Sequence, residues 1–150
     1  MGSFTLVSSG GDHACGIGAD GTIACWGGNA FGQATPPGGA FVSVSAGTRH
    51  TCGIKIDGTI AGWGDKEDSR ATPPADRFSS VSAGYMHACG VKADGTIACW
   101  GDNTYAQTNS PVGTFVSVSA GHVHSCGAKA DGTVACWGDD EHGQAAPPGT

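Results

Sequence analysis

Hydrophobic residues along the chain fall in short runs that do not keep the 3.6-residue period of an amphipathic helix. In FVSVSA (residues 41–46) valines alternate with serines, which is the two-residue period of a half-buried strand. HTCGIK (50–55) is a second short run, and an Asp-Gly turn leads into a third, GTIAGWG (58–64). Stretches such as GQATPPG (32–38) contain prolines and suit an outer edge strand or a loop. The pattern predicts units of three or four short antiparallel strands.

The same unit returns every 37 residues along the whole chain. Four phenylalanines mark its start, and four copies fill residues 4–150 almost without remainder. Such units in tandem describe the blades of a β-propeller, whereas the coils of a β-solenoid are usually shorter and carry fewer hairpins. We therefore expect an all-β propeller in one repeat domain, residues 4–150, preceded by residues 1–3, which resemble the remnant of an expression tag. The expected blades are residues 4–40, 41–77, 78–114 and 115–150.

The repeated phrase AGxxHxCGxKxDGTxxCWGxNxxGQxxPP resembles the short RCC1-type propeller repeat. It is most similar to the bacterial RCC1-like proteins, a group that includes β-lactamase inhibitor protein II, and to cysteine-bearing repeats of some plant receptor ectodomains. The resemblance covers essentially the whole chain and implies an RCC1-like propeller. Members of this family usually have seven blades, and this sequence carries four repeats.

The strand register predicts what the cysteines do. If residues 19–21 form a three-residue hairpin loop with Gly21 at positive φ, counting outward places Cys15 directly opposite Cys25. Sulfurs in such a pair are close enough for a disulfide. The same count places Cys52 opposite Gly62, which leaves a free thiol at Cys52. The other two expected disulfides are Cys89–Cys99 and Cys126–Cys136.

Two other interpretations of the cysteines remain open at this point. Reduced cysteines can act as small core residues. Alternatively, His13 faces the same side as Cys15 and Cys25, which gives a possible zinc cluster, although the spacing matches no common zinc motif and a fourth ligand is missing. Losing one cysteine in one copy fits a local disulfide better than a site that needs every ligand. We therefore predict no metal site, and paired cysteines indicate an extracellular or periplasmic protein.

Composition narrows the function classes. The formal net charge is −6, with only seven Lys and Arg residues, which argues against nucleic-acid binding. No apolar run approaches the roughly 18 to 20 residues that span a bilayer, so no membrane partner is expected. No signal peptide is visible, although an export signal could have been replaced by the tag. Neither a Walker loop nor GxSxG, HExxH or paired CxxC motifs occur, so we expect no cofactor and no enzyme.

Residues that recur in every copy should do the same structural work in every blade. The four histidines are expected to satisfy buried backbone groups, and the four tryptophans to pack between neighbouring blades. These residues are His13, His50, His87 and His124, with Trp26, Trp63, Trp100 and Trp137.

Function is expected where the copies differ. Two windows vary, one after each Ala-Gly pair or its equivalent and one after each Trp-Gly pair, and equivalent loops of a propeller gather on one face. Aromatic, Met and Arg side chains anchor protein interfaces, and in the resembled inhibitor the face loops grip a partner protein. Neutral variation of exposed loops is the alternative. The predicted partner-binding residues are Phe31, Arg49, Tyr85, Met86, Tyr105 and His122.

Four blades shaped for a larger ring would expose an apolar face at each end. We expect a homodimer that closes an eight-bladed ring, with a four-bladed monomer or a fragment of a longer protein as alternatives. The predicted function is a non-catalytic scaffold that recognises an unknown protein partner. The alternative is a structural, self-assembling propeller fragment, natural or engineered, without a ligand. The second copy also departs from its siblings at residues 66–70, which marks it as the blade most suited to a special role.

Overall fold

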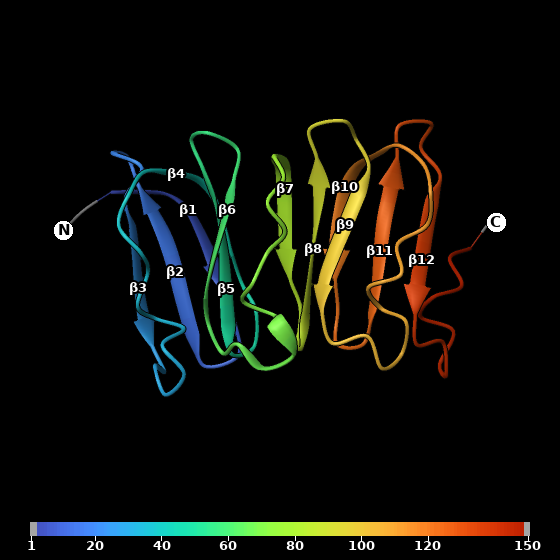
Figure 1. Ribbon diagram of the computed structural model, residues 1–150, viewed down its shortest axis with the longest axis horizontal. Coiled ribbons are helices and arrows are strands. Elements are labelled where there is room, and N and C mark those ends of the chain that lie inside the picture. The colour runs from blue at the N-terminus through green and yellow to red at the C-terminus, as the bar shows by residue number, and fades with distance from the viewer. Residues whose placement is uncertain (1–2, 149–150) are drawn as a thin grey trace.

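The computed structural model describes residues 3–148 and shows an all-β chain in which each repeat forms one three-stranded antiparallel sheet. The four sheets stand side by side in sequence order (Figure 1). This confirms the predicted blades as the unit of the fold. Among the described residues, no helix is long and apolar enough to cross a bilayer. The elements are β1 (Phe4–Ser9), β2 (His13–Gly18), β3 (Ile23–Gly27), β4 (Phe41–Ala46), β5 (His50–Lys55), β6 (Ile60–Gly64), η1 (Glu67–Ser69), β7 (Phe78–Ala83), β8 (His87–Lys92), β9 (Ile97–Gly101), β10 (Phe115–Ala120), β11 (His124–Lys129) and β12 (Val134–Gly138).

The hairpin between the second and third strands of each blade is held by an aspartate. In the first blade the amide of Gly18 donates to the carbonyl of Thr22 across 2.8 Å, and Gly21 takes a φ of +81°. Oδ1 of Asp20 accepts from the amide of Thr22 at 3.0 Å and from its hydroxyl at 2.7 Å. These bonds, that of the hydroxyl foremost, lower the pKa of Asp20. The aspartates at 57, 94 and 131 repeat the arrangement and are thus committed to turns.

The register confirms the predicted cysteine pairs. Cys15 lies opposite Cys25 with their Cα atoms 4.0 Å apart, and the two sulfurs form a disulfide. The equivalent disulfides in the third and fourth blades are Cys89–Cys99 and Cys126–Cys136. Cys52 lies opposite Gly62 and is a fully buried free thiol, whose pKa burial raises to about 12.

The structure explains why residue 62 is glycine and not cysteine. A Cβ built on Gly62 would lie 2.4 Å from the carbonyl oxygen of Ala71, because the main chain at Ala71 passes directly against this point of β6. Ala71 itself is buried. Residue 62 is therefore glycine because the backbone of Ala71 occupies the place of the Cβ that the cysteine of the other three blades carries.

The hydrophobic core lies between neighbouring blades. At the first junction Cys15 and Ile17 pack against Phe41, Val44 and Trp63 of the second blade. The rings of Phe41 and Trp63 meet edge to face with their centroids 6.2 Å apart. The second and third junctions repeat the cluster with Phe78 and Trp100, then Phe115 and Trp137.

The tryptophans also join the blades through hydrogen bonds. Nε1 of Trp63 donates to the carbonyl of Gln33 in the preceding blade at 2.9 Å. Trp100 and Trp137 do the same to Arg70 and Gln107, at 3.1 and 2.8 Å. These contacts bear out the prediction that the tryptophans pack between blades, whereas Trp26, in the first blade, is 48% exposed.

His13 and His87 differ from the prediction, because each has a hydroxyl group of the next blade as its partner and not a backbone group. Nε2 of His13 lies 2.7 Å from Oγ1 of Thr51, and Nε2 of His87 lies 2.7 Å from Oγ of Ser125. His50 would meet residue 88, which is alanine, and both of its buried ring nitrogens lack a partner within the described chain. The residue that follows each repeated histidine, at positions 14, 51, 88 and 125, decides whether a hydroxyl faces the preceding blade. The predicted bonds to backbone did not take this residue into account.

Candidate partner-binding face

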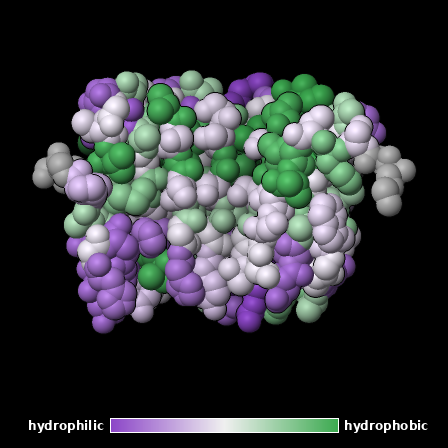
Figure 2. Space-filling view, turned by 180° about the vertical axis from the view of Figure 1, so that it is seen from behind, coloured by the Kyte–Doolittle hydropathy of each residue, from purple (hydrophilic) through white to green (hydrophobic). Residues whose placement is uncertain are grey.

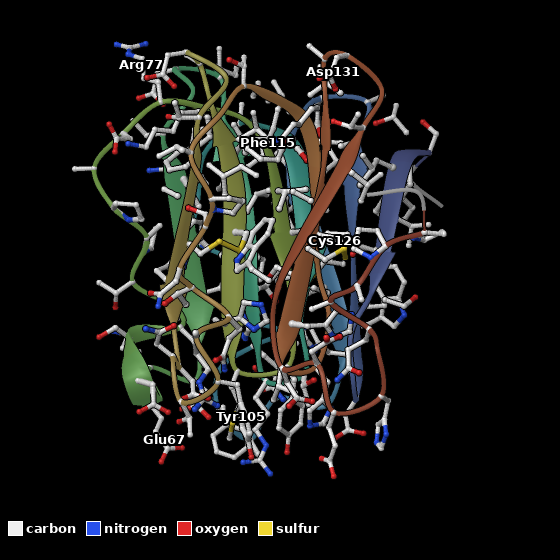
Figure 3. All side chains as sticks on the ribbon, turned by 90° about the vertical axis from the view of Figure 1, so that its right-hand side faces the viewer. Glu67, Arg77, Tyr105, Phe115, Cys126 and Asp131 are labelled. Atoms are coloured by element: carbon white, nitrogen blue, oxygen red, sulfur yellow. A yellow bond between two sulfur atoms is a disulfide. The ribbon has the colours of Figure 1, made fainter. Side chains whose placement is uncertain are left out.

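Both variable windows of each repeat lie at one end of the blades. In the second blade the amide of Asp65, after the Trp-Gly pair, donates to the carbonyl of Arg49, after the Ala-Gly pair, at 2.9 Å. Equivalent bonds join the two windows in the other three blades. Figure 3 shows Glu67 and Tyr105 at this end, while Arg77 and Asp131 lie at the opposite, hairpin end. We call this end the loop face; it comprises residues 10–12, 28–35, 47–49, 65–72, 84–86, 102–109, 121–123 and 139–146.

Three of the four longer loops present an aromatic or imidazole ring at the same point and hold it in the same way. The amide of Phe31 donates to Oε1 of Gln33 at 2.9 Å, and the amide of Tyr105 donates to Oε1 of Gln107 at 2.8 Å. His142 makes the same bond to Gln144. Gln33 and Gln107 are buried, whereas the rings of Phe31 and Tyr105 are 45% and 52% exposed. These internal bonds fix the main chain at residues 31, 105 and 142, whose rings are exposed to solvent.

A second bond stiffens each of these three loops. Oδ1 of Asn29 accepts from the amide of Ala34 at 2.9 Å, and Oδ1 of Asn103 accepts from the amide of Thr108 at 3.0 Å. Asp140 takes the same role toward Ala145 in the fourth blade. Loops closed by their own side chains lose little conformational freedom when they bind, which favours recognition.

The six predicted binding residues all lie on the loop face, and four of them form two pairs across blade junctions. The guanidinium carbon of Arg49 lies 4.9 Å from the centroid of the Phe31 ring. The rings of Tyr85 and His122 stack with centroids 3.9 Å apart and an interplanar angle of 12°. Met86 is half-buried, and Tyr105 stands exposed on its own loop.

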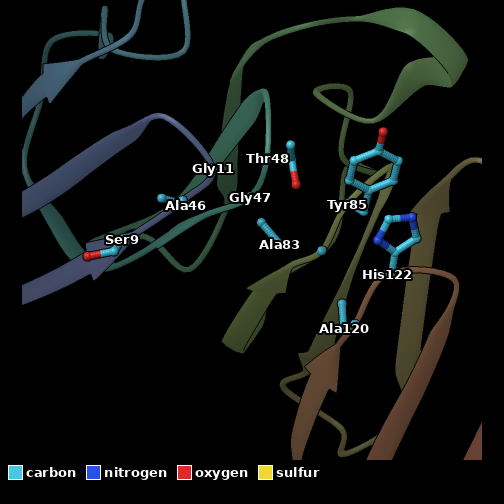
Figure 4. A pocket seen from close by; sticks show the side chains of 12 residues that line it. Ser9, Gly11, Ala46, Gly47, Thr48, Ala83, Tyr85, Ala120 and His122 are labelled. Carbon is cyan, nitrogen blue, oxygen red and sulfur yellow. The ribbon is translucent and has the colours of Figure 1, made fainter. Parts of the chain in front are cut away.

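The Tyr85–His122 stack borders a hollow where the four blades meet (Figure 4). Each blade lines it with the end of its first strand, mostly with Ser, Ala and Gly residues, and its volume is about 330 Å³. Main-chain bonds run from blade to blade along this wall: the amide of Thr48 donates to the carbonyl of Gly84 at 3.2 Å, and that of Tyr85 to Gly121 at 3.1 Å. Seen from behind, apolar side chains gather in the upper part of the molecule, over its N-terminal half (Figure 2).

The negative charge of the protein is concentrated on the loop face. Eight of the thirteen acidic residues lie there with three basic ones, a net charge of −5. The hairpin end holds the other five acidic and four basic residues, a net charge of −1. The acidic residues of the loop face are Asp12, Asp65, Glu67, Asp68, Asp102, Asp139, Asp140 and Glu141.

The second blade replaces the glutamine of its siblings with Arg70, which is 1% exposed. The guanidinium donates to Asp65 at 3.1 Å and to Asp68 at 3.1 Å, and its Nε donates to the carbonyl of Glu67. Asp68 takes a φ of 52° in this tightly turned loop. The departure seen in the sequence at residues 66–70 is thus an internal ion-pair cluster, with Lys66, Glu67 and Asp68 exposed around it.

Sequence reasoning missed His142 and the role of the glutamines. The signal was present, because a Gln stands two residues after each exposed ring in three copies. Within residues 3–148, no group of three or more His, Cys, Asp or Glu side chains is placed to hold a metal ion. The cysteines of the considered zinc cluster, Cys15 and Cys25, are joined as a disulfide.

Comparison with known proteins agrees with this architecture. No curated protein matches the sequence. Among solved structures, the CRINKLY WD40 ectodomain of the Arabidopsis thaliana receptor kinase ACR4 is 29% identical with a TM-score of 0.76, covering 90% of this chain and 49% of that one. The ectodomain of the Physcomitrella patens receptor kinase CR4 is 28% identical with a TM-score of 0.79, covering 91% and 41%.

Prp20p from Saccharomyces cerevisiae shares the fold at 15% identity, with a TM-score of 0.78 over 93% of this chain and 45% of that one. The chain therefore spans 41% to 49% of the length of these three structures. The family model of the Regulator of chromosome condensation (RCC1) repeat matches four times, at residues 4–33, 41–69, 78–107 and 115–144. These four matches follow the four blades, and the chain belongs to the RCC1 repeat family.

Proposed function

We propose that the protein is a non-catalytic binding scaffold that recognises a protein partner through its loop face. The observation that carries the proposal is the set of exposed rings at Phe31, Tyr105 and His142, each fixed by the same glutamine bond on a loop whose neighbours vary. Rigid aromatic side chains give large contact area at low entropic cost, and such residues anchor protein interfaces.

The partner is expected to present a basic surface. A net charge of −5 on the loop face would attract a positively charged partner and repel nucleic acid. Four of the five acidic residues at the hairpin end accept turn bonds from threonines, and the fifth, Asp76, forms an ion pair with Lys92. Their carboxylates are therefore less available to a partner than those of the loop face. Three disulfides fit an oxidising compartment, and we propose that the protein works outside the cell or in a periplasm.

The test uses binders selected against the purified chain from a displayed library of small protein domains. A loop variant carries Phe31→Ala, Tyr105→Ala and His142→Ala, and a matched control carries Ile56→Ala and Val112→Ala at the hairpin end, where these side chains are 73% and 95% exposed. We expect most selected binders to be rich in Lys and Arg, to lose at least about 100-fold in affinity for the loop variant, and to bind the control unchanged.

Binding should also weaken as salt rises, because charge attraction contributes to association. Binders that recognise the loop variant as tightly as the native chain, or that depend on Ile56 and Val112, would overturn the proposal.

A further inference from the structure

The two ends of the row of blades are the two halves of the junction that recurs three times inside the chain. At each internal junction a Phe, a Val and a Trp of one blade cover a Cys and aliphatic residues of the blade before it. The first-blade end face, Phe4, Val7 and Trp26, has no blade before it among the described residues. The fourth-blade end face, Cys126, Ala128 and Val134, has no blade after it in the same range.

Exposure shows that these faces lack their covering. Phe4 is 50% exposed, while its counterpart Phe41 is 3% exposed. Val7 is 63% exposed against 4% for Val44. On the other end face, Val134 is 39% exposed against 8% for Ile97. Side chains that form the core at three junctions thus lie on the surface at the two ends.

The polar contacts of the junction are also split between the two ends. At the three internal junctions, Nε1 of the tryptophan donates to the carbonyl of the residue at the glutamine position in the preceding blade. Among the described residues Trp26 makes no such bond, and the carbonyl at the equivalent position of the last blade, Gln144, receives none. In the same way the serine hydroxyls of the first three blades accept an amide of the next blade, as Ser82 does from Ala120 at 2.9 Å. Within residues 3–148, Ser119 accepts no such bond and the amide of Ser9 donates none.

We propose that two copies of this chain close head to tail into one eight-bladed ring, each first-blade end face packing on the fourth-blade end face of the other copy. One copy supplies what the other lacks at both ends, so a pair related by a two-fold axis leaves neither face uncovered.

Closure would also complete the hollow beside the Tyr85–His122 stack. Its wall is built by main-chain bonds that pass from residue 11 to 47, from 48 to 84 and from 85 to 121. The next bond in the series runs from the amide of His122 to the carbonyl of Gly10 in the second copy. In the pair, His122 lies beside Gly11 of the second copy, and the hollow is enclosed by eight blades.

The experiment is light scattering on the full chain as it elutes from a sizing column, repeated from about 1 to 100 μM. We expect a mass of twice 14.8 kDa. Phe4→Asp blocks one end face and Val134→Asp blocks the other, and each variant alone should be monomeric, with a dissociation constant raised at least about 100-fold. Val112→Asp, at a 95% exposed site away from both end faces, is the matched control and should remain a dimer.

A mixture of the two variants distinguishes a blocked end face from a misfolded chain. Each retains the intact half that the other needs, so the mixture should recover a dimer through one junction, although neither forms a dimer with itself. A native chain that has the mass of one copy at every concentration, or that forms open chains of three or more copies, overturns the proposal. A mixture that stays monomeric overturns the head-to-tail geometry.

Discussion

Replacing Ala88 with serine should stabilise the protein, because it restores a hydroxyl that two other junctions possess. His50 is fully buried and both of its ring nitrogens lack a partner among the described residues. His13 and His87, which occupy the same place in their blades, lie 2.7 Å from Thr51 and Ser125. The His50 ring sits against Gly47 as the His13 ring sits against Gly10, with Cε1 2.7 Å from a Cβ built on either glycine. A hydroxyl at residue 88 should therefore reach Nε2 of His50.

The magnitude follows from the two opposing effects. A new hydrogen bond to a buried group that was unsatisfied contributes about 1 to 2 kcal/mol, because the ring nitrogen is already desolvated. Fitting one oxygen atom into a fully buried site costs part of this, so a net gain of about 1 kcal/mol is expected. For a chain of this length, that gain raises Tm by roughly 2 to 4 °C.

The assay is urea denaturation at pH 7 with the disulfides intact, followed by tryptophan fluorescence. Ser125→Ala is the converse control. It removes the hydroxyl beside His87 and should lower the free energy of unfolding by about 1 to 2 kcal/mol. The two changes are at different junctions and should add within about 0.5 kcal/mol. If Ala88→Ser leaves stability unchanged or lowers it while Ser125→Ala is destabilising, the assignment of a missing bond at His50 is wrong.

The remaining predictions concern pH and the cysteines. Burial lowers the pKa of His50 and of His87 to about 4, so between pH 6.5 and 4 the unfolded chain binds more protons than the folded one, and the free energy of unfolding falls as pH is lowered through this window. At about 1.4 kcal/mol per pKa unit this amounts to roughly 3 kcal/mol for each histidine, and equal urea midpoints at pH 7 and 4.5 would refute it. Cys52 should stay unreactive in the native protein and give one alkylated thiol after denaturation without reductant, whereas seven thiols would exclude the disulfides. Gly62→Cys should form no fourth disulfide and should destabilise the chain, because its Cβ would lie 2.4 Å from the carbonyl oxygen of Ala71; Gly62→Ala is the control and should destabilise by a similar amount. A gain in stability with all thiols oxidised in Gly62→Cys would contradict this account.

The sequence predicted the repeated parts of the molecule well, because each was supported by four copies. Alternating residues and Asp-Gly turns determine the hairpin, and the hairpin register alone places Cys15 opposite Cys25. Contacts between blades were harder to predict, because they join residues 30 or 38 positions apart. The bond from His13 to Thr51 needs the relative position of two sheets, which periodicity within one blade does not supply.

Gly62 illustrates the same difficulty. In the sequence it resembles a lost disulfide, and only the path of the chain at Ala71 shows that a side chain has no room there. The candidate binding residues were found as positions that vary, but their preorganisation was not foreseen, since it depends on glutamines that look like ordinary repeat residues. Arg70 was noticed as a departure, and its burial follows only from the ion pairs with Asp65 and Asp68.

The central claim is that the loop face is the recognition surface of this scaffold. Amide hydrogen exchange with and without a selected binder tests it most directly, because it maps the contact without altering the protein. Slower exchange is predicted in residues 28–35, 102–109 and 139–146, with no change in the hairpin loops at 19–22, 56–59, 93–96 and 130–133. Protection centred on those hairpin loops, with unchanged exchange at Phe31 and Tyr105, would contradict the account.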